Sequence, residues 1–165
     1  MPFIAAMLAA SAAPLPAPPA CRAADLRLTI DGRDGDFDGM SHGGTQVTIR
    51  NTGRACTLSA LPSVELRDAR GRPLPAVRRA PVGMHPGPVM VPVRLGHGAR
   101  AAADLRWVSG PVFPRSRRIR VASVAVRVGT AVLRAPLAAV LYGAAGAPVG
   151  FDQTPLRVVE GTTTD

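Results

Sequence analysis

Two short segments of the chain place a methionine beside a histidine. The first is Met40-Ser41-His42 and the second is Met84-His85. Thioether sulfur and imidazole nitrogen are ligands that suit copper, Cu(I) above all. If the two segments met in the folded protein, Met40, His42, Met84 and His85 would form a copper site, which is the alternative to a protein without a cofactor. Under the simpler interpretation the histidines cap turns and the methionines fill gaps in the packing.

Cys21 and Cys56 are the two cysteines of the chain. In an oxidising compartment they would pair most simply with each other. Closing a loop of this length would stabilise the fold by roughly 3–4 kcal/mol on the chain-entropy model. A lipid-modified Cys21 at a mature N-terminus is the less favoured alternative. That kind of signal has an aliphatic residue three positions before the cysteine, and here the position holds Pro18.

Side chains suited to catalysis occur, but not in a catalytic pattern. A hydrolytic triad needs a nucleophile, a base and an orienting acid within hydrogen-bond reach. Ser41 and His42 are sequence neighbours, and the chain has no nucleophile elbow. No glycine-rich loop follows a strand and opens a helix, as nucleotide-phosphate motifs require. We therefore expect a protein that is not an enzyme.

The elements that would position these residues follow from an arginine-centred repeat. Successive side chains of a strand point to opposite faces, so two apolar residues can face a core while the arginine between them faces water. With turn residues roughly every 8–12 positions, the repeat predicts an all-β fold, an antiparallel β-sandwich of about seven to nine strands. The six triplets are Leu26-Arg27-Leu28, Val93-Arg94-Leu95, Leu105-Arg106-Trp107, Ile119-Arg120-Val121, Val126-Arg127-Val128 and Leu156-Arg157-Val158.

Individual strands carry further signals. Arg118 to Val128 is the longest clean alternation, and Pro92 within Val89 to Leu95 favours an edge position. The stretch from Pro136 to Pro148 is compatible with either a short helix or an apolar strand. Trp107 is expected on the inward face of its strand together with Leu105.

The net charge is +9, and all twenty basic residues are arginine. The absence of lysine indicates a compositional bias of the source genome rather than a selected surface. Binding of nucleic acid would require arginine clusters interleaved with stacking aromatics, whereas the chain has one Trp, one Tyr and four Phe. We expect no nucleic acid partner, and at most weak, salt-sensitive contact with anionic polymers or lipid of the cell envelope.

The N-terminal segment has the layout of a secretory signal. An apolar run from Phe3 to Ala13 is followed by prolines and small residues up to Ala20, although no Lys or Arg precedes the run. The run is too short to span a bilayer, which requires about 18 apolar residues. The expected organisation is a signal peptide (1–20), a β-sandwich domain (21–160) and a disordered tail (161–165), with a periplasmic or secreted location. We therefore expect a non-enzymatic binding or structural module of the cell envelope. The alternative is a periplasmic copper carrier that uses the two Met/His segments.

Several segments together resemble a known family. They are Gly39 to Thr45, Arg50 to Leu58, Leu61-Pro62 with the strand and turn that follow, Gly83 to Val89, and Leu105 to Gly110. Over roughly Cys21 to Val128 the chain is similar to the bacterial domain of unknown function 4232, a set of exported proteins. The resemblance implies an immunoglobulin-like sandwich, an exported or lipid-anchored location and no established activity.

The resemblance also bears on the cysteines and on Trp107. Relatives often carry another cysteine after the Trp-containing strand, and this chain has none there. Cys21 with Cys56 is then the only intramolecular pair that the resemblance allows. Immunoglobulin-like sandwiches commonly pack a core tryptophan near their disulfide, which is the expectation for Trp107.

Overall fold

The computed structural model describes residues 18–31, 39–79 and 90–159. The expected signal peptide up to residue 17, the expected tail (161–165) and the Met84-His85 pair lie outside the described residues.

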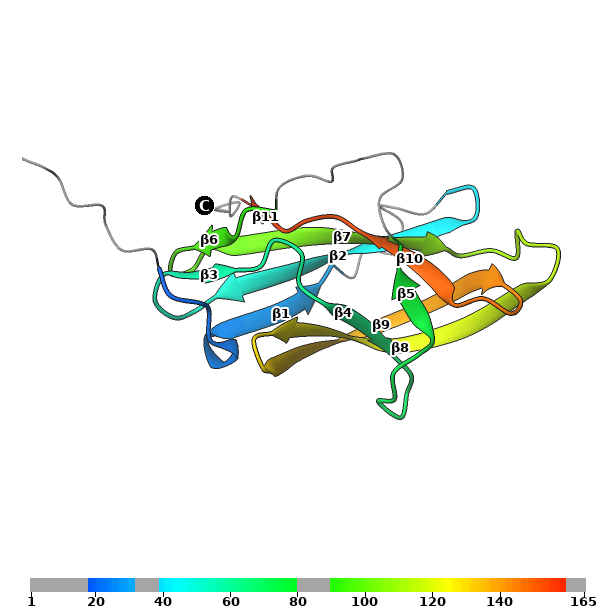
Figure 1. Ribbon diagram of the computed structural model, residues 1–165, viewed down its shortest axis with the longest axis horizontal. Helices are drawn as coiled ribbons and strands as arrows, with labels where there is room; N and C mark the ends of the chain where they lie inside the picture. Colours follow the sequence, from blue (N-terminus) through cyan, green and yellow to red (C-terminus); the bar gives the residue numbers. More distant parts are fainter. Residues whose placement is uncertain (1–17, 32–38, 80–89, 160–165) are drawn as a thin grey trace, which may run out of the picture.

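The described residues form eleven β-strands and one short 3₁₀ turn (Figure 1). In chain order they are η1 (Ala23–Asp25), β1 (Leu26–Ile30), β2 (His42–Asn51), β3 (Cys56–Leu58), β4 (Val64–Arg67), β5 (Ala76–Arg78), β6 (Val93–Leu95), β7 (Arg100–Val108), β8 (Ser116–Val128), β9 (Ala131–Ala144), β10 (Val149–Gln153) and β11 (Arg157–Val159). The prediction of an all-β protein is confirmed.

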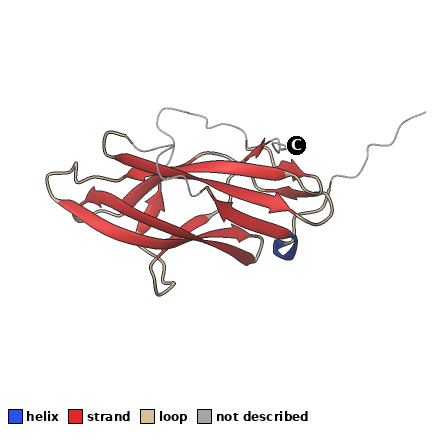
Figure 2. Ribbon diagram, turned by 180° about the vertical axis from the view of Figure 1, so that it is seen from behind, coloured by secondary structure: helices blue, strands red, loops and turns tan. Residues whose placement is uncertain are grey.

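The strands are arranged in a sandwich. One sheet has the order β1-β2-β7-β10-β5, with β11 also paired to β7, and a second has the order β4-β8-β9. Strands β3 and β6 form a separate antiparallel pair. Figures 1 and 2 show the long strands of the first two sheets as two layers that lie face to face. The immunoglobulin-like connectivity stays a prediction.

The arginine-centred triplets behave as expected in five of six cases. In each triplet the arginine is exposed, and the first apolar residue is buried. The sixth triplet differs at its last residue. Val158 lies in the short strand β11, which pairs with β7, and it is 55% exposed. The core between the layers is built from aliphatic side chains together with Trp107 and Phe151. Its largest fully buried members are Phe151, Leu26, Ile49, Leu66, Leu95, Leu105, Leu141, Val124, Val126 and Val149.

The expected clean alternation of Arg118 to Val128 is interrupted by a change of register. Strand β8 pairs regularly with β9 except between Val121 and Ser123, where the ladder shifts. Val121 and Val124 are three residues apart and both are buried, which a regular two-residue period cannot achieve. The β-bulge has its extra residue on β9, because β9 advances three positions from Ala139 to Pro136 while β8 advances two from Val121 to Ser123. Pro136, which has no N–H to donate, pairs with Ser123 at this irregular point.

Three elements differ from or go beyond the sequence prediction. The ambiguous stretch from Pro136 is a strand, since β9 continues to Ala144. Strands β5 and β10 were not predicted, and they pair with each other in parallel. In β10 the buried residues Val149 and Phe151 alternate with Gly150, so a weak period-two signal is present but short.

Trp107 is buried, as predicted, but it does not lie near the disulfide. Its backbone pairs with Gly43 near the start of β2 and with Phe151 of β10. Cys56 follows the opposite end of β2, beyond Asn51. Eight residues of extended chain separate these two ends by about 26 Å. The expectation of a tryptophan packed near the disulfide is therefore wrong.

Asn51 connects three segments at one end of the sandwich. Its side chain is fully buried, and its Nδ2 donates to the carbonyl oxygens of Arg54 (2.8 Å), Leu95 (3.1 Å) and Gly96 (3.1 Å). Its Oδ1 accepts a bond from the N–H of Gly53 (2.9 Å). Both the turn after β2 and the turn after β6 thus have buried or partly buried backbone groups that depend on this one amide.

Replacing Asn51 by alanine should destabilise the protein strongly. The Asn51→Ala variant leaves several backbone groups without partners, and we expect the free energy of unfolding to fall by about 2–4 kcal/mol. Urea denaturation followed by tryptophan fluorescence measures the change. Thr29→Ala, at an exposed position of β1, is the control and should change stability by less than about 0.5 kcal/mol. Equal midpoints for the two variants would contradict this account.

The turn after β4 is organised by the carboxylate of Asp68. Its Oδ1 accepts the backbone N–H groups of Arg70 and Arg72, both at 2.9 Å, and its Oδ2 accepts the Nε–H of Arg72 at 3.0 Å. The bond from the Arg72 backbone N–H, with smaller contributions from the Arg72 side chain and the Arg70 N–H, lowers the pKa of Asp68 below 3.8.

This lowered pKa predicts a contribution to stability with a defined pH range. Because the folded state favours the charged carboxylate, the contribution is present above the pKa of the unfolded chain and is lost as the pH falls through the lower folded pKa. NMR titration should place the Asp68 pKa below 3.8. In Arg72→Ala the pKa should rise only in part, since the backbone N–H remains. A full return to the ordinary value in that variant would contradict the assignment to the backbone.

Candidate functional site

The first Met/His segment forms a tight, strained hairpin turn. Gly39 and His42 exchange backbone hydrogen bonds of 2.9 and 3.1 Å, and the two residues between them have positive φ, 42° for Met40 and 66° for Ser41. Such a turn prefers Asn or Gly at these positions. Met40 is 96% exposed at the tip, and the Nδ1 of His42 lies 3.1 Å from the Met40 carbonyl oxygen. The turn thus carries a thioether and an imidazole at its surface.

The predicted copper ligands are brought together only in part. Met40 and His42 share one turn, whereas Met84 and His85 lie outside the described residues. His97 is at the other end of β2, with its Nδ1 3.1 Å from the Gly53 carbonyl oxygen, so about 30 Å of strand separates it from His42. The described residues contain no group of three or more His, Cys, Asp or Glu that could hold a metal ion. The copper site of Met40, His42, Met84 and His85 therefore stays a prediction.

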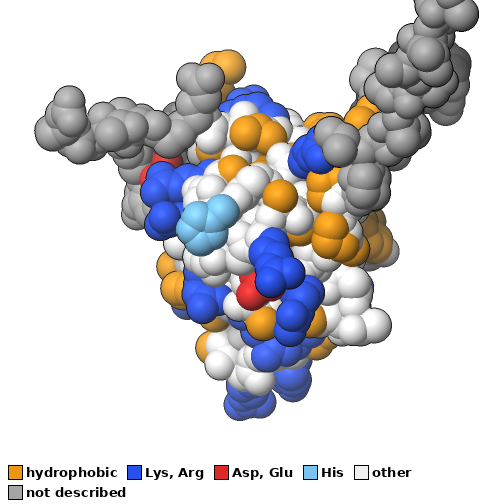
Figure 3. Space-filling model, turned by 90° about the vertical axis from the view of Figure 1, so that its left-hand side faces the viewer, with side chains coloured by type: hydrophobic (Ala, Val, Ile, Leu, Met, Phe, Trp, Pro, Cys, Tyr) orange, Lys and Arg blue, Asp and Glu red, His pale blue; other side chains and the backbone are white. Residues whose placement is uncertain are grey.

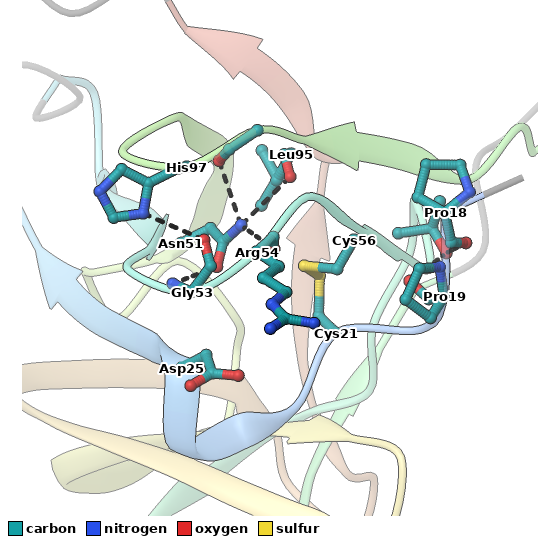
Figure 4. The surroundings of a disulfide bond; sticks show 12 residues. Pro18, Pro19, Cys21, Asp25, Asn51, Gly53, Arg54, Cys56, Leu95 and His97 are labelled. Atoms are coloured by element: carbon teal, nitrogen blue, oxygen red, sulfur yellow. Dashed lines mark hydrogen bonds between the residues drawn. A yellow bond between two sulfur atoms is a disulfide. The ribbon is translucent and has the colours of Figure 1, made fainter.

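The disulfide between Cys21 and Cys56 is present, as predicted. It joins residues 35 positions apart with a Cα–Cα distance of 4.8 Å, and both cysteines are buried. Backbone bonds reinforce it, since Thr57 donates to Pro19 (2.8 Å) and accepts from Cys21 (2.9 Å). Figure 4 shows the bridge between the start of the described chain and β3, close to Asn51. The N-terminal segment is thereby fixed to the sandwich.

A depression lies on the surface beside this disulfide. It has a volume of about 520 Å³ and is lined by Pro19, Ala20, Arg22, Asp25, Gly53, Arg54, Ala55 and Cys56. Gly53 is required here, because a Cβ at this position would lie 2.6 Å from the side chain of Asp25. Figure 3 views the end of the molecule where β3 and β6 lie, and arginine is the dominant charged side chain on it.

A second depression lies on the outer face of the six-stranded sheet. Its volume is about 430 Å³, and three arginines line it, one from each of three neighbouring strands: Arg27, Arg50 and Arg100. Backbone pairing sets them side by side, because Arg27 pairs with Arg50 and Arg50 with Arg100. We call these three residues the arginine row. Guanidinium groups in such an array can bind carboxylate or phosphate oxygens through paired hydrogen bonds.

Sequence reasoning missed the arginine row. Arg27 was identified as the centre of a triplet, but Arg50 and Arg100 lie at strand ends and belong to no triplet. Adjacency of the three depends on the registers of β1 with β2 and of β2 with β7, which join residues far apart in the chain. The outer face of the other sheet is basic as well, with Arg118, Arg120 and Arg127 exposed on β8.

Loss of the disulfide should lower stability without changing the fold. In Cys21→Ala/Cys56→Ala the unfolded chain regains the freedom of a 35-residue loop, and we expect the free energy of unfolding to fall by about 3–4 kcal/mol. Urea denaturation with and without a reducing agent measures this. Reduction should lower the midpoint of the wild-type protein and leave that of the double variant unchanged. A wild-type midpoint that reduction does not affect would contradict the prediction.

The described part of the chain contains no helix with the length and hydrophobicity of a membrane span.

No curated protein and no solved structure gives a significant match to the chain. One family model does match, the domain of unknown function DUF4232, over residues 21–159, which is most of the sequence and includes both cysteines and every strand described above. The chain belongs to the DUF4232 family of domains of unknown function.

Proposed function

We propose that this protein is an exported β-sandwich module of the cell envelope that has no catalytic activity and acts by binding anionic envelope material. The use of arginine in place of lysine is compositional, and the observation that carries the proposal is instead where the arginines lie in the fold. Exposed arginines occupy the outer faces of both large sheets, and the net charge of the chain is +9. A surface of this kind attracts polyanions over several ångströms.

Export is supported by the disulfide. Structural disulfides persist in oxidising compartments and are rare in the reducing cytosol. Cys21 also comes directly after the segment whose composition is that of a secretory signal, so the bridge would fix the beginning of the mature chain. The DUF4232 resemblance implies the same location.

A binding role rather than catalysis is supported by the contacts of His42 and His97, the two histidines among the described residues. The Nδ1 atoms of His42 and His97 each lie 3.1 Å from a backbone carbonyl oxygen, that of Met40 and of Gly53 respectively. A general base would instead be expected near a serine hydroxyl or another nucleophile. Both rings are exposed on turns and support the local backbone, which favours a structural role for them.

The proposal predicts salt-sensitive binding to envelope fragments. Purified protein should co-sediment with isolated bacterial envelopes at about 0.05 M salt. At about 0.5 M salt, where the Debye length is roughly 4 Å, it should be released. An acidic protein of similar size is the control and should stay in the supernatant in both conditions. The absence of binding at low salt, or binding that salt does not weaken, would contradict the proposal.

Location and catalysis are tested in the same preparation. When the full chain is expressed in a bacterium, the oxidised protein should appear in the periplasm or medium, with both cysteines protected from a thiol-reactive label. Oxidised protein that remains in the cytoplasm would contradict export. Turnover of ester, peptide or glycoside substrates that is lost in His42→Ala would contradict the absence of catalysis.

A further inference from the structure

The arginine row has a geometry that a general basic surface lacks. Arg27, Arg50 and Arg100 project from the outer face, because the neighbouring residues Leu26, Ile49 and Ala101 point into the core. Adjacent strands lie about 4.8 Å apart, so the three Cα positions span about 10 Å across the sheet. The row therefore presents three positive charges in line and at regular spacing.

The three arginines of the row have few partners within the protein. Within the described residues, the side chains of Arg50 and Arg100 make neither a hydrogen bond nor a salt bridge, and the side chain of Arg27 donates only to the carbonyl oxygens of Ala24 and Leu26. Like charges directly opposite each other on paired strands destabilise a sheet. An anion bound across the row would remove this repulsion.

Other exposed arginines of the same sheet do have carboxylate partners. Arg79 pairs with Asp152, and Arg157 pairs with Asp104 at 3.4 Å. The carboxylate of Asp31 also lines the depression. Asp31 is hydrogen-bonded through its backbone to Gln46 of β2 and is four residues along the chain from Arg27, so it lies away from the row. The arginine row is thus the basic end of this depression, which is otherwise lined mainly by polar side chains and which we call the groove.

The rest of the groove is suited to a polar ligand. Thr29 and Thr48 pair across β1 and β2 in the next outward row, and Thr52 and Gln46 complete the lining. Ile30 is the one apolar residue that lines the groove. A lipid surface would be held by exposed aromatic or large aliphatic side chains as well as by charge. The lining therefore favours a soluble chain of anionic groups over a membrane.

We propose that the arginine row is the binding site for a linear envelope polymer that carries carboxylate or phosphate groups. This inference rests on the proposed function and locates it at one groove. Each guanidinium binds one oxyanion of the polymer, and three successive contacts give the row an advantage over isolated arginines. The hydroxyls of Thr29 and Thr48 donate to the polymer backbone between its charges.

Charge reversal at the centre of the row tests the site. Arg50→Glu should fold, since glutamate would lie between two arginines. Its affinity for oligogalacturonate, the carboxylate probe, or for polyphosphate, the phosphate probe, should fall at least about tenfold by calorimetry at about 0.05 M salt. The matched control is Arg120→Glu, an exposed arginine of β8 with the same change in net charge, and it should lose less than about threefold. In NMR titrations of the wild type, the amides of β1, β2 and β7 should shift.

The outcomes separate the site from the proposed function. Equal losses in Arg50→Glu and Arg120→Glu would overturn the arginine row as a site and leave binding to anions intact. Binding to phosphatidylglycerol vesicles without binding to either polymer would overturn the polymer as the ligand. Failure to bind the polymers, the vesicles and the envelope fragments would overturn the proposed function itself. Tighter binding of one polymer supports the proposal and identifies the oxyanion.

Discussion

The buried amide of Asn51 is the interaction on which one end of this sandwich depends. It ends β2 inside the core and satisfies backbone groups of the turns that lead into β3 and out of β6. Those turns carry the disulfide partner Cys56 and the His97 loop. A buried polar side chain with all its bonds made gives a core a defined geometry that apolar packing alone does not impose. The disulfide then holds the N-terminal segment against a rigid surface.

The two large sheets also keep the many arginines of this chain out of its core. Alternation places aliphatic residues between the layers and arginines outside, so each strand separates its charge from the core. Part of the outside charge is neutralised within the sheet, as at Arg79 with Asp152. The remainder is open to solvent and sets the electrostatic character of the molecule. Fold and surface charge therefore come from the same two-residue period.

Much of this architecture follows from local pattern, and the failures have physical causes. The triplets predicted strands at Leu26, Leu105 and Ile119 because strand period is a local property. The β-bulge was missed, since its extra residue lies on β9 and is revealed only by the pairing of β9 with β8. The candidate site was missed for a related reason. Its arginines meet through strand register, which long-range pairing determines and which a single sequence does not display.

The bulge and Pro136 have a consequence for how copies of this protein behave toward one another. Strand β9 is a long edge strand of its sheet, and within the described residues no strand pairs with its outer side. A long unpaired edge strand can pair with a strand of another molecule and so promote aggregation. Pro136 has no N–H to donate, and the β-bulge beside it makes this part of the strand irregular. Proline and β-bulges are features by which edge strands avoid pairing with another sheet, so this stretch of β9 is a poor template for pairing between copies of the protein.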